Sequence, residues 1–176
     1  MEIKGTQRIE ASRTAVWTAL NDPEVLKQSI PGCESIEKVS DTEMNAKARL
    51  RIGPVKASFS GKVILSDLDP PNGYTITGTG SGGTAGFAKG GAKVRLAEDG
   101  SATLLTYDVE ADIGGKLASL GGRLIEGTAK KLAAEFFEKF SVAVTPPAAH
   151  PVVEPAIIAA AAPKKAGWLR RMLGKG

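Results

Sequence analysis

Apolar and polar residues alternate through much of the first two thirds of the chain, with the period of two that is typical of half-buried strands. In "EMNAKARLRIG" every second residue from Met44 to Ile52 is apolar, and "VKASFSGKVIL" repeats the pattern. "PPNG" at 70–73 supplies a turn before "YTITGTGSG", "GAKVRLAEDG" and "SATLLTYDVEADIG". We therefore expect a long antiparallel meander with a hairpin turn ending at Gly100.

Two short helices are expected before the meander, after a first strand in "EIKGTQRIE". Ser12 has the side chain and position of an N-cap for a helix within "ASRTAVWTALND". Asp22 caps a second helix, with Pro23 at its first position and Pro31-Gly32 ending it. Together with a closing helix, these elements predict an α+β domain.

The closing helix is expected over about 116–143, where the apolar residues recur at helical spacing from Ile125 to Phe140. Leu117, Leu120 and Leu124 fall on a different side of the same helix. One interpretation is that the helix starts near Gly122 and the earlier leucines pack locally in a loop. The other is that "KLASLGGRLIEG" forms a mobile apolar lip at the mouth of a cavity.

Charge is distributed unevenly along the 176 residues, whose formal net charge is +4. All of this excess lies in residues 146–176, so residues 1–145 are neutral overall. The domain therefore gives no electrostatic reason to expect nucleic acid as a partner. "PPAAHPVVEPAIIAAAAP" predicts a semi-extended, flexible linker over residues 146–163, between a domain at 1–145 and a tail at 164–176.

Few residues of the domain offer catalytic or metal-binding chemistry. His150 is the only histidine and lies in the linker, so no histidine base or metal ligand is expected in the domain. Cys33, the single cysteine, lacks a histidine partner and fits a reducing compartment. The glycines at 78–83 match a dinucleotide motif, but a strand follows them where a helix is needed. We expect no cofactor and no metal.

Four stretches in order, "PGCESIEKV", "RIGPVKASFSGKV", "GTGSGGTAGFAKGGAKVRL" and "GTAKKLAAEFFEKF", resemble the CoxG family of carbon monoxide dehydrogenase subunits. This family belongs to the wider START/Bet v 1-like superfamily, and the resemblance covers essentially all of residues 1–145. It implies a helix-grip fold, in which a seven-stranded antiparallel sheet grips a C-terminal helix around a hydrophobic cavity. The candidates for lining this cavity are Trp17, Leu26, Ile30, Phe59, Phe87, Leu117, Leu120 and Leu124.

The resemblance also implies a function. It points to a non-catalytic accessory protein of a molybdenum-containing carbon monoxide dehydrogenase, or of a related hydroxylase, that is associated with the cytoplasmic membrane and with quinone. The expected ligand is therefore a respiratory quinone, bound without covalent attachment.

The tail, residues 164–176, has the pattern of an interfacial amphipathic helix. Its apolar side and its cations comprise Lys164, Lys165, Trp168, Leu169, Arg170, Arg171, Met172, Leu173 and Lys175. The N-terminus has no signal peptide, and the longest apolar run, "AIIAAAA", is too short to span a bilayer. We expect a cytoplasmic protein that binds anionic lipid weakly, reversibly and in a salt-dependent manner. A disordered tail, and a tail helix docked in a protein groove, are the alternatives.

Three functions remain open from the sequence. The first is a carrier that binds a quinone in its cavity and is brought to the membrane by its tail. The second is a recruitment adaptor with a fully packed interior and no ligand, and the third is a small hydrolase or cyclase that uses carboxylates in the cavity. A large apolar void favours the first, a tightly packed core the second, and buried paired carboxylates the third.

Overall fold

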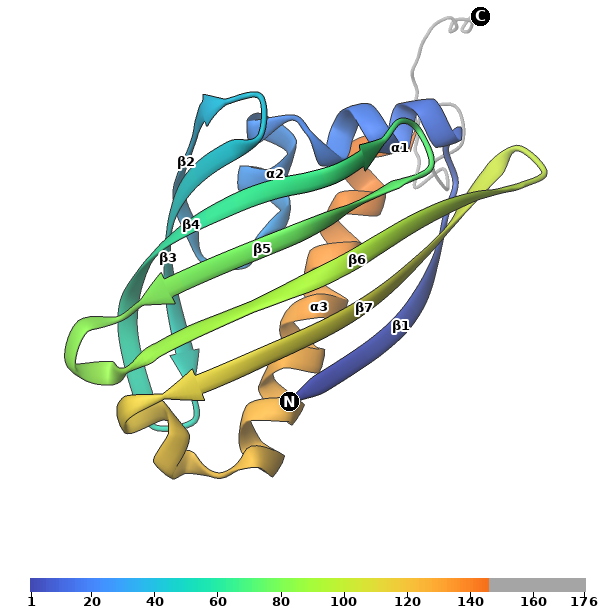
Figure 1. Cartoon of the computed structure of the whole chain (residues 1–176). Helices are drawn as coiled ribbons and strands as arrows, with labels where there is room; N and C mark the ends of the chain where they lie inside the picture. Colours follow the sequence, from blue (N-terminus) through green and yellow to red (C-terminus); the bar gives the residue numbers. More distant parts are fainter. Residues whose placement is uncertain (146–176) are drawn as a thin grey trace, which may run out of the picture. The chain divides into compact units, whose positions relative to one another are not determined.

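Backbone pairing in the computed structural model, which describes residues 1–145, confirms the meander and its closing helix (Figure 1). Within these residues the elements are β1 (Glu2–Ile9), α1 (Arg13–Leu20), α2 (Pro23–Ser29), β2 (Cys33–Ser40), β3 (Glu43–Ile52), β4 (Val55–Asp69), β5 (Gly73–Ser81), the 3₁₀ helix η1 (Gly83–Ala85), β6 (Phe87–Asp99), β7 (Ala102–Gly114), the 3₁₀ helix η2 (Gly115–Leu120) and α3 (Gly122–Val144). The predicted linker and tail lie outside the described residues.

The sheet of residues 1–145 is antiparallel throughout, in the order β1-β7-β6-β5-β4-β3-β2. Strands β2 to β7 follow the chain as a meander, and β1 closes the series by pairing with β7. Helix α3 crosses one face of the curved sheet, while α1 and α2 lie at one end and η2 at the other (Figure 1). One face of each strand is therefore turned towards α3 and the other towards solvent.

The two short helices begin where the sequence predicts. The Ser12 hydroxyl accepts a hydrogen bond from the Ala15 amide at 3.2 Å, and the Asp22 carboxylate accepts one from the Glu24 amide at 3.0 Å. Pro23 opens α2, where its missing N–H costs nothing. These caps fix α1 and α2 as the cover over one end of the sheet.

The closing helix is shorter than the predicted 116–143 at its start. Gly121 has φ +92°, a left-handed conformation that favours glycine, and it separates η2 from α3. Leu117 and Leu120 consequently lie in η2, so helical spacing does not govern their direction. The structure agrees with a helix that starts at Gly122, preceded by leucines that pack locally.

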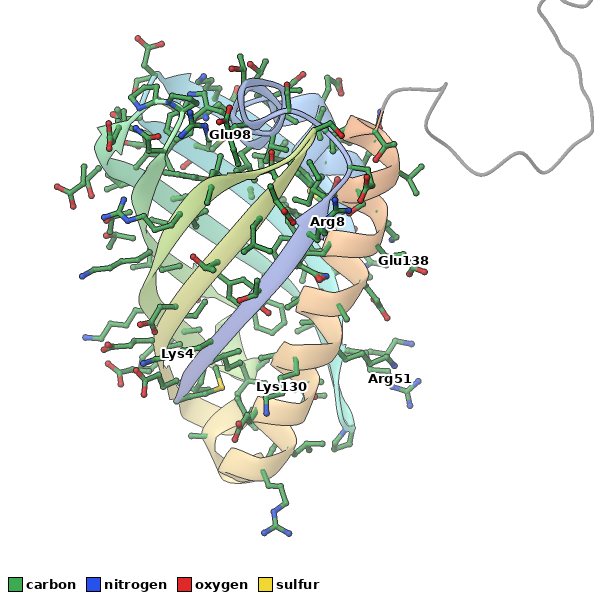
Figure 2. All side chains as sticks on the ribbon, turned by 90° about the vertical axis from the view of Figure 1, so that its right-hand side faces the viewer. Lys4, Arg8, Arg51, Glu98, Lys130 and Glu138 are labelled. Carbon is green, nitrogen blue, oxygen red and sulfur yellow. The ribbon has the colours of Figure 1, made fainter. Side chains whose placement is uncertain are left out.

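Aromatic side chains from α3 hold the helix against the sheet. Phe140 is fully buried and stacks on Phe136 with 5.5 Å between ring centroids, and Phe137 stacks on Tyr107 of β7 at 5.3 Å. Charged side chains such as Arg51 and Glu138 point away from the layer between α3 and the sheet (Figure 2). These aromatic contacts pack the C-terminal half of α3 firmly.

A candidate ligand cavity between the sheet and helix α3

An apolar cavity of about 320 Å³ lies between α3 and the inner face of the sheet. Strands β2 to β7 contribute most of its wall, and α1, α2 and α3 close it. The lining residues are Leu20, Leu26, Ile30, Ile36, Met44, Ala46, Val63, Leu65, Tyr74, Ile76, Ala92, Val94, Leu105, Tyr107, Val109, Ala133, Phe136 and Phe137. None of these side chains is charged, so the cavity suits a hydrophobic molecule.

Two tyrosine hydroxyls supply the polar side-chain atoms of this lining. Tyr74, at the start of β5, is only 4% exposed, and its ring meets Trp17 of α1 edge-on at a centroid distance of 5.3 Å. Within residues 1–145 no group hydrogen-bonds the Tyr74 hydroxyl. The Tyr107 ring instead extends over Gly5 of β1, where a larger side chain would collide with its hydroxyl.

Burial determines the protonation state of Tyr74. Because the phenolate form would lose its hydration, burial raises the pKa of Tyr74 well above the ordinary value for a tyrosine. The hydroxyl therefore stays protonated at every physiological pH. It is a hydrogen-bond donor available to an acceptor oxygen, such as a carbonyl, on a bound ligand.

The structure brings some of the sequence-predicted site residues to the cavity and leaves others outside it. Leu26 and Ile30 are part of the lining, and Trp17 reaches it through its contact with Tyr74. Phe59 lies on the inner face of β4, against Gly82, beyond the lining residues.

The leucines of the proposed lip lie at the other end of the molecule, around η2. Leu117 is 3% exposed and packs near Gly86, Leu120 is half-buried, and Leu124 lies 40% exposed against Gly53 in the β3–β4 turn.

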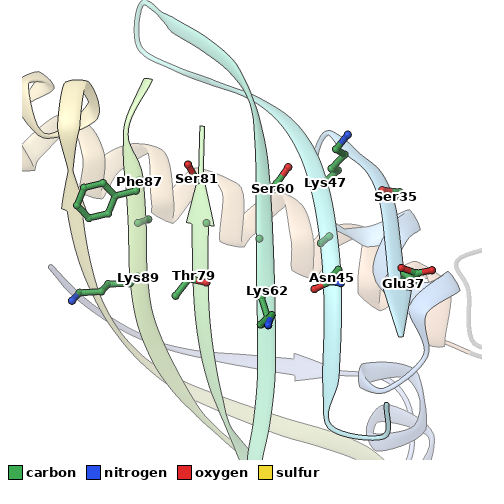
Figure 3. A pocket seen from close by; sticks show the side chains of 14 residues that line it. Ser35, Glu37, Asn45, Lys47, Ser60, Lys62, Thr79, Ser81, Phe87 and Lys89 are labelled. Carbon is green, nitrogen blue, oxygen red and sulfur yellow. The ribbon is translucent and has the colours of Figure 1, made fainter. Parts of the chain in front are cut away.

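Phe87 is a correction to the sequence analysis. Its side chain lies on the outer face of the sheet, 48% exposed, with its ring over Gly114 of β7 (Figure 3). The reason is the pleat: in β6 the inner positions are Ala88, Gly90 and Ala92, so Phe87 one residue away must point outward. It does not line the inner cavity.

A second hollow, open to solvent and about 640 Å³ in volume, lies on the outer face around Phe87 (Figure 3). Its lining includes four hydroxyl side chains, the side chains of Glu37 and Asn45, and those of Lys47, Lys62 and Lys89. Lys62 also pairs with Glu43 at 3.4 Å. An apolar ligand would find one aromatic ring there and no enclosure. The smaller inner cavity is therefore the better candidate site, because it removes apolar surface from water.

Catalytic groups are scarce in the described part of the chain. No aspartate or glutamate lines the cavity, and residues 1–145 contain no cluster of His, Cys, Asp and Glu suited to a metal ion. The Cys33 thiol donates a weak hydrogen bond to the Ser35 carbonyl at 3.5 Å, and burial raises its pKa, which disfavours a reactive thiolate. The arrangement can enclose and orient a ligand, but it offers no pair of acids for hydrolysis.

Sequence reasoning missed most of the lining, including Tyr74, Ala133 and Phe137. Tyr74 lies on the same side of β5 as Ile76, and this period-two pattern marks both as inward-facing. The signal was available in "YTITGTGSG", but only the sheet register shows that Tyr74, Val94 and Tyr107 are neighbours across three strands.

An antiparallel seven-stranded sheet closed over one long C-terminal helix, with an apolar cavity between them, defines the START/Bet v 1-like class of helix-grip proteins. Among solved structures, a START superfamily protein from Mycobacterium smegmatis matches with a TM-score of 0.63 at 14% identity, covering 81% of this chain and 96% of that one. The Zhui aromatase/cyclase from Streptomyces sp. R1128 matches with a TM-score of 0.58 at 12% identity, covering 82% and 93%. At these identities the likeness concerns the fold alone.

The chain belongs to the CoxG family of carbon monoxide dehydrogenase subunits, whose model matches residues 5–145. A conserved protein from Geobacillus kaustophilus is similar at 30% identity with a TM-score of 0.77, covering 82% of this chain and 95% of that chain. The comparison with curated proteins gave no match. Family and fold together indicate a ligand-binding accessory protein.

None of the helices within residues 1–145 combines the length and the apolar character needed to cross a bilayer.

Proposed function

We propose that the cavity binds a respiratory quinone, and that the protein carries this quinone between the cytoplasmic membrane and a molybdenum-containing carbon monoxide dehydrogenase or a related hydroxylase. The partner enzyme oxidises its own substrate and passes the electrons to the quinone, which takes up protons and leaves as the quinol. The chain itself supplies binding and positioning. The tail at 164–176 brings the cavity to anionic lipid on the inner face of the membrane.

One observation carries this proposal: an apolar cavity of about 320 Å³ lies between α3 and the sheet, and no charged side chain lines it. A quinone carbonyl placed against the Tyr74 hydroxyl would accept a hydrogen bond from it, while the apolar lining would cover the remainder of the molecule. A fully packed interior, which a ligand-free adaptor would have, offers no such space.

The test is to express the intact chain in a quinone-containing bacterium, purify it without detergent, and analyse an organic extract by mass spectrometry. Quinone in near-stoichiometric amount supports the carrier. If the extract contains no quinone, and still contains none after incubation with quinone-loaded liposomes, the proposal is wrong and the recruitment adaptor takes its place. A Tyr74→Phe variant purified in parallel checks the anchoring group, because it removes one oxygen and leaves the ring.

A further inference from the structure

On strands β5 and β6 the side chains of the inner face become smaller from the α1–α2 end towards η2. Along β5 the inner positions run Tyr74, Ile76, Gly78 and Gly80. The partners of these positions on β6 run Val94, Ala92, Gly90 and Ala88. The cavity lining reaches Ile76 and Ala92, so the glycine rows continue its floor in the direction of η2.

Most glycines of the sheet are explained by what surrounds them. A side chain at Gly90 would collide with the carbonyl oxygen of Glu110, and one at Gly61 would lie 2.9 Å from that of Thr79. At Gly82 the space is taken by the ring of Phe59. The fold itself therefore requires these positions to lack a side chain.

Gly78 and Gly80 have no such explanation. Among residues 1–145, a methyl group at Gly78 would meet only the Lys62 carbonyl oxygen at 3.6 Å, and one at Gly80 only the Ser60 carbonyl oxygen at 3.8 Å, both ordinary contacts. Neither glycine adopts a left-handed φ. Glycine in a strand weakens it, so two glycines that neither backbone nor packing demands are a cost to stability. What their absence of side chains provides is open space above the strand.

Helix α3 contributes one small residue to the wall of the cavity. Ala133 lines the cavity, and Ala129, one turn closer to η2, lies on the same helical face. Ile125 and Phe137 are buried on this side of the helix, and Leu132 and Phe136 are partly buried there. The small residue that α3 contributes to the cavity wall is Ala133.

We infer that Gly78 and Gly80 keep open a slender apolar track for the chain of an amphiphile whose oxygen-bearing head group lies against Tyr74. The inference rests on the proposed function and adds the orientation of the ligand. The polar side-chain atoms of the lining lie at the end near Tyr74, and no polar side chain on β5 or β6 faces the track. The head group is therefore anchored at Tyr74, and the chain of the ligand runs over the glycines towards η2. Gly78 and Gly80 therefore decide whether the apolar chain of the ligand fits in the protein.

The decisive experiment compares the full chain with a Gly78→Val/Gly80→Val variant by titration calorimetry, using two probes. One probe is a benzoquinone without a side chain, and the other is the same benzoquinone with a long isoprenoid chain. The variant should bind the chainless probe as the wild type does and lose at least about tenfold in affinity for the long-chain probe. Thr79→Val is the matched control, because it places the same side chain on the outer face of the same strand.

Each outcome decides the matter. If the variant loses affinity for the long-chain probe alone, the result supports the track. If it loses affinity equally for both probes, or for neither, the track is wrong, although quinone binding by the wild type still stands. If the wild-type chain binds neither probe, the proposed function has failed, and the track fails with it. Thermal melts establish that the variant is folded. If the valines prevent folding, Gly78→Ala tests the same point, and it should cause a smaller loss of affinity that is again confined to the long-chain probe.

Discussion

Ala133 faces the cavity from α3 and offers a substitution in which stability and ligand binding should change in opposite directions. Replacing it with leucine adds three carbon atoms that would enter the empty space. At about 0.8 kcal/mol per buried methylene, this gains about 2.4 kcal/mol, and fixing the leucine rotamer takes back about 0.5–1 kcal/mol. The ligand-free variant should therefore be more stable by about 1.5 kcal/mol, which corresponds to a rise in Tm of roughly 3–6 °C for a domain of this size.

The same leucine removes volume from a cavity of about 320 Å³, so binding of a long-chain quinone should weaken at least tenfold, by about 1.4 kcal/mol or more. Delipidated proteins are compared by thermal unfolding and by quinone titration. The neighbouring Ala134, which is exposed on α3, provides the matched control: Ala134→Leu should alter neither property appreciably. A destabilised Ala133→Leu protein, or one that binds quinone as tightly as the wild type, would refute the reasoning.

Four further predictions follow from single positions. Tyr74→Phe should weaken quinone binding roughly tenfold, because it removes the hydroxyl that donates to the quinone carbonyl. The quinone affinity of the wild type should not change between about pH 6 and 9, because the raised pKa of Tyr74 keeps its hydroxyl protonated. A pH-dependent quinone affinity in titrations would argue against Tyr74 as the donor. Phe87→Glu, on the outer face, should leave quinone loading unchanged in the extraction assay. Phe140→Ala should cost about 3–5 kcal/mol in chemical denaturation, since its ring is fully buried; a loss below about 1 kcal/mol would contradict the described packing. Trp168→Glu should abolish liposome binding, and unchanged sedimentation with anionic vesicles would reject the proposed role of the tail.

Local rules were sufficient for most of the secondary structure. Alternation along β3, the Ser12 and Asp22 caps and the stripe on α3 are set by residues a few positions apart, and the sequence displays them directly. The start of α3 was the exception. Helical spacing could be continued back to residue 116, but the left-handed φ of Gly121 breaks the helix there, and a glycine accepts either conformation.

The candidate site was predicted less completely, and Phe87 shows why. In the sequence it is a large apolar residue among glycines, which suggests a cavity wall; its direction depends on the pleat of β6 and on which face α3 covers. Tyr74 shows the converse case. Its inward direction follows from alternation, but its burial against Trp17 depends on elements that are distant along the chain.

The sequence by itself determined most of the elements, the family, and the difference in charge between residues 1–145 and residues 146–176, because these depend on residue types and on spacing within short windows. Only the tertiary structure decided which glycines are required by crowding and which leave space, since Gly90 and Gly78 are identical residues that face each other across β5 and β6. They differ in the atoms that a side chain at each position would contact. Cavity shape is a property of surfaces brought together by folding, and no single strand contains it.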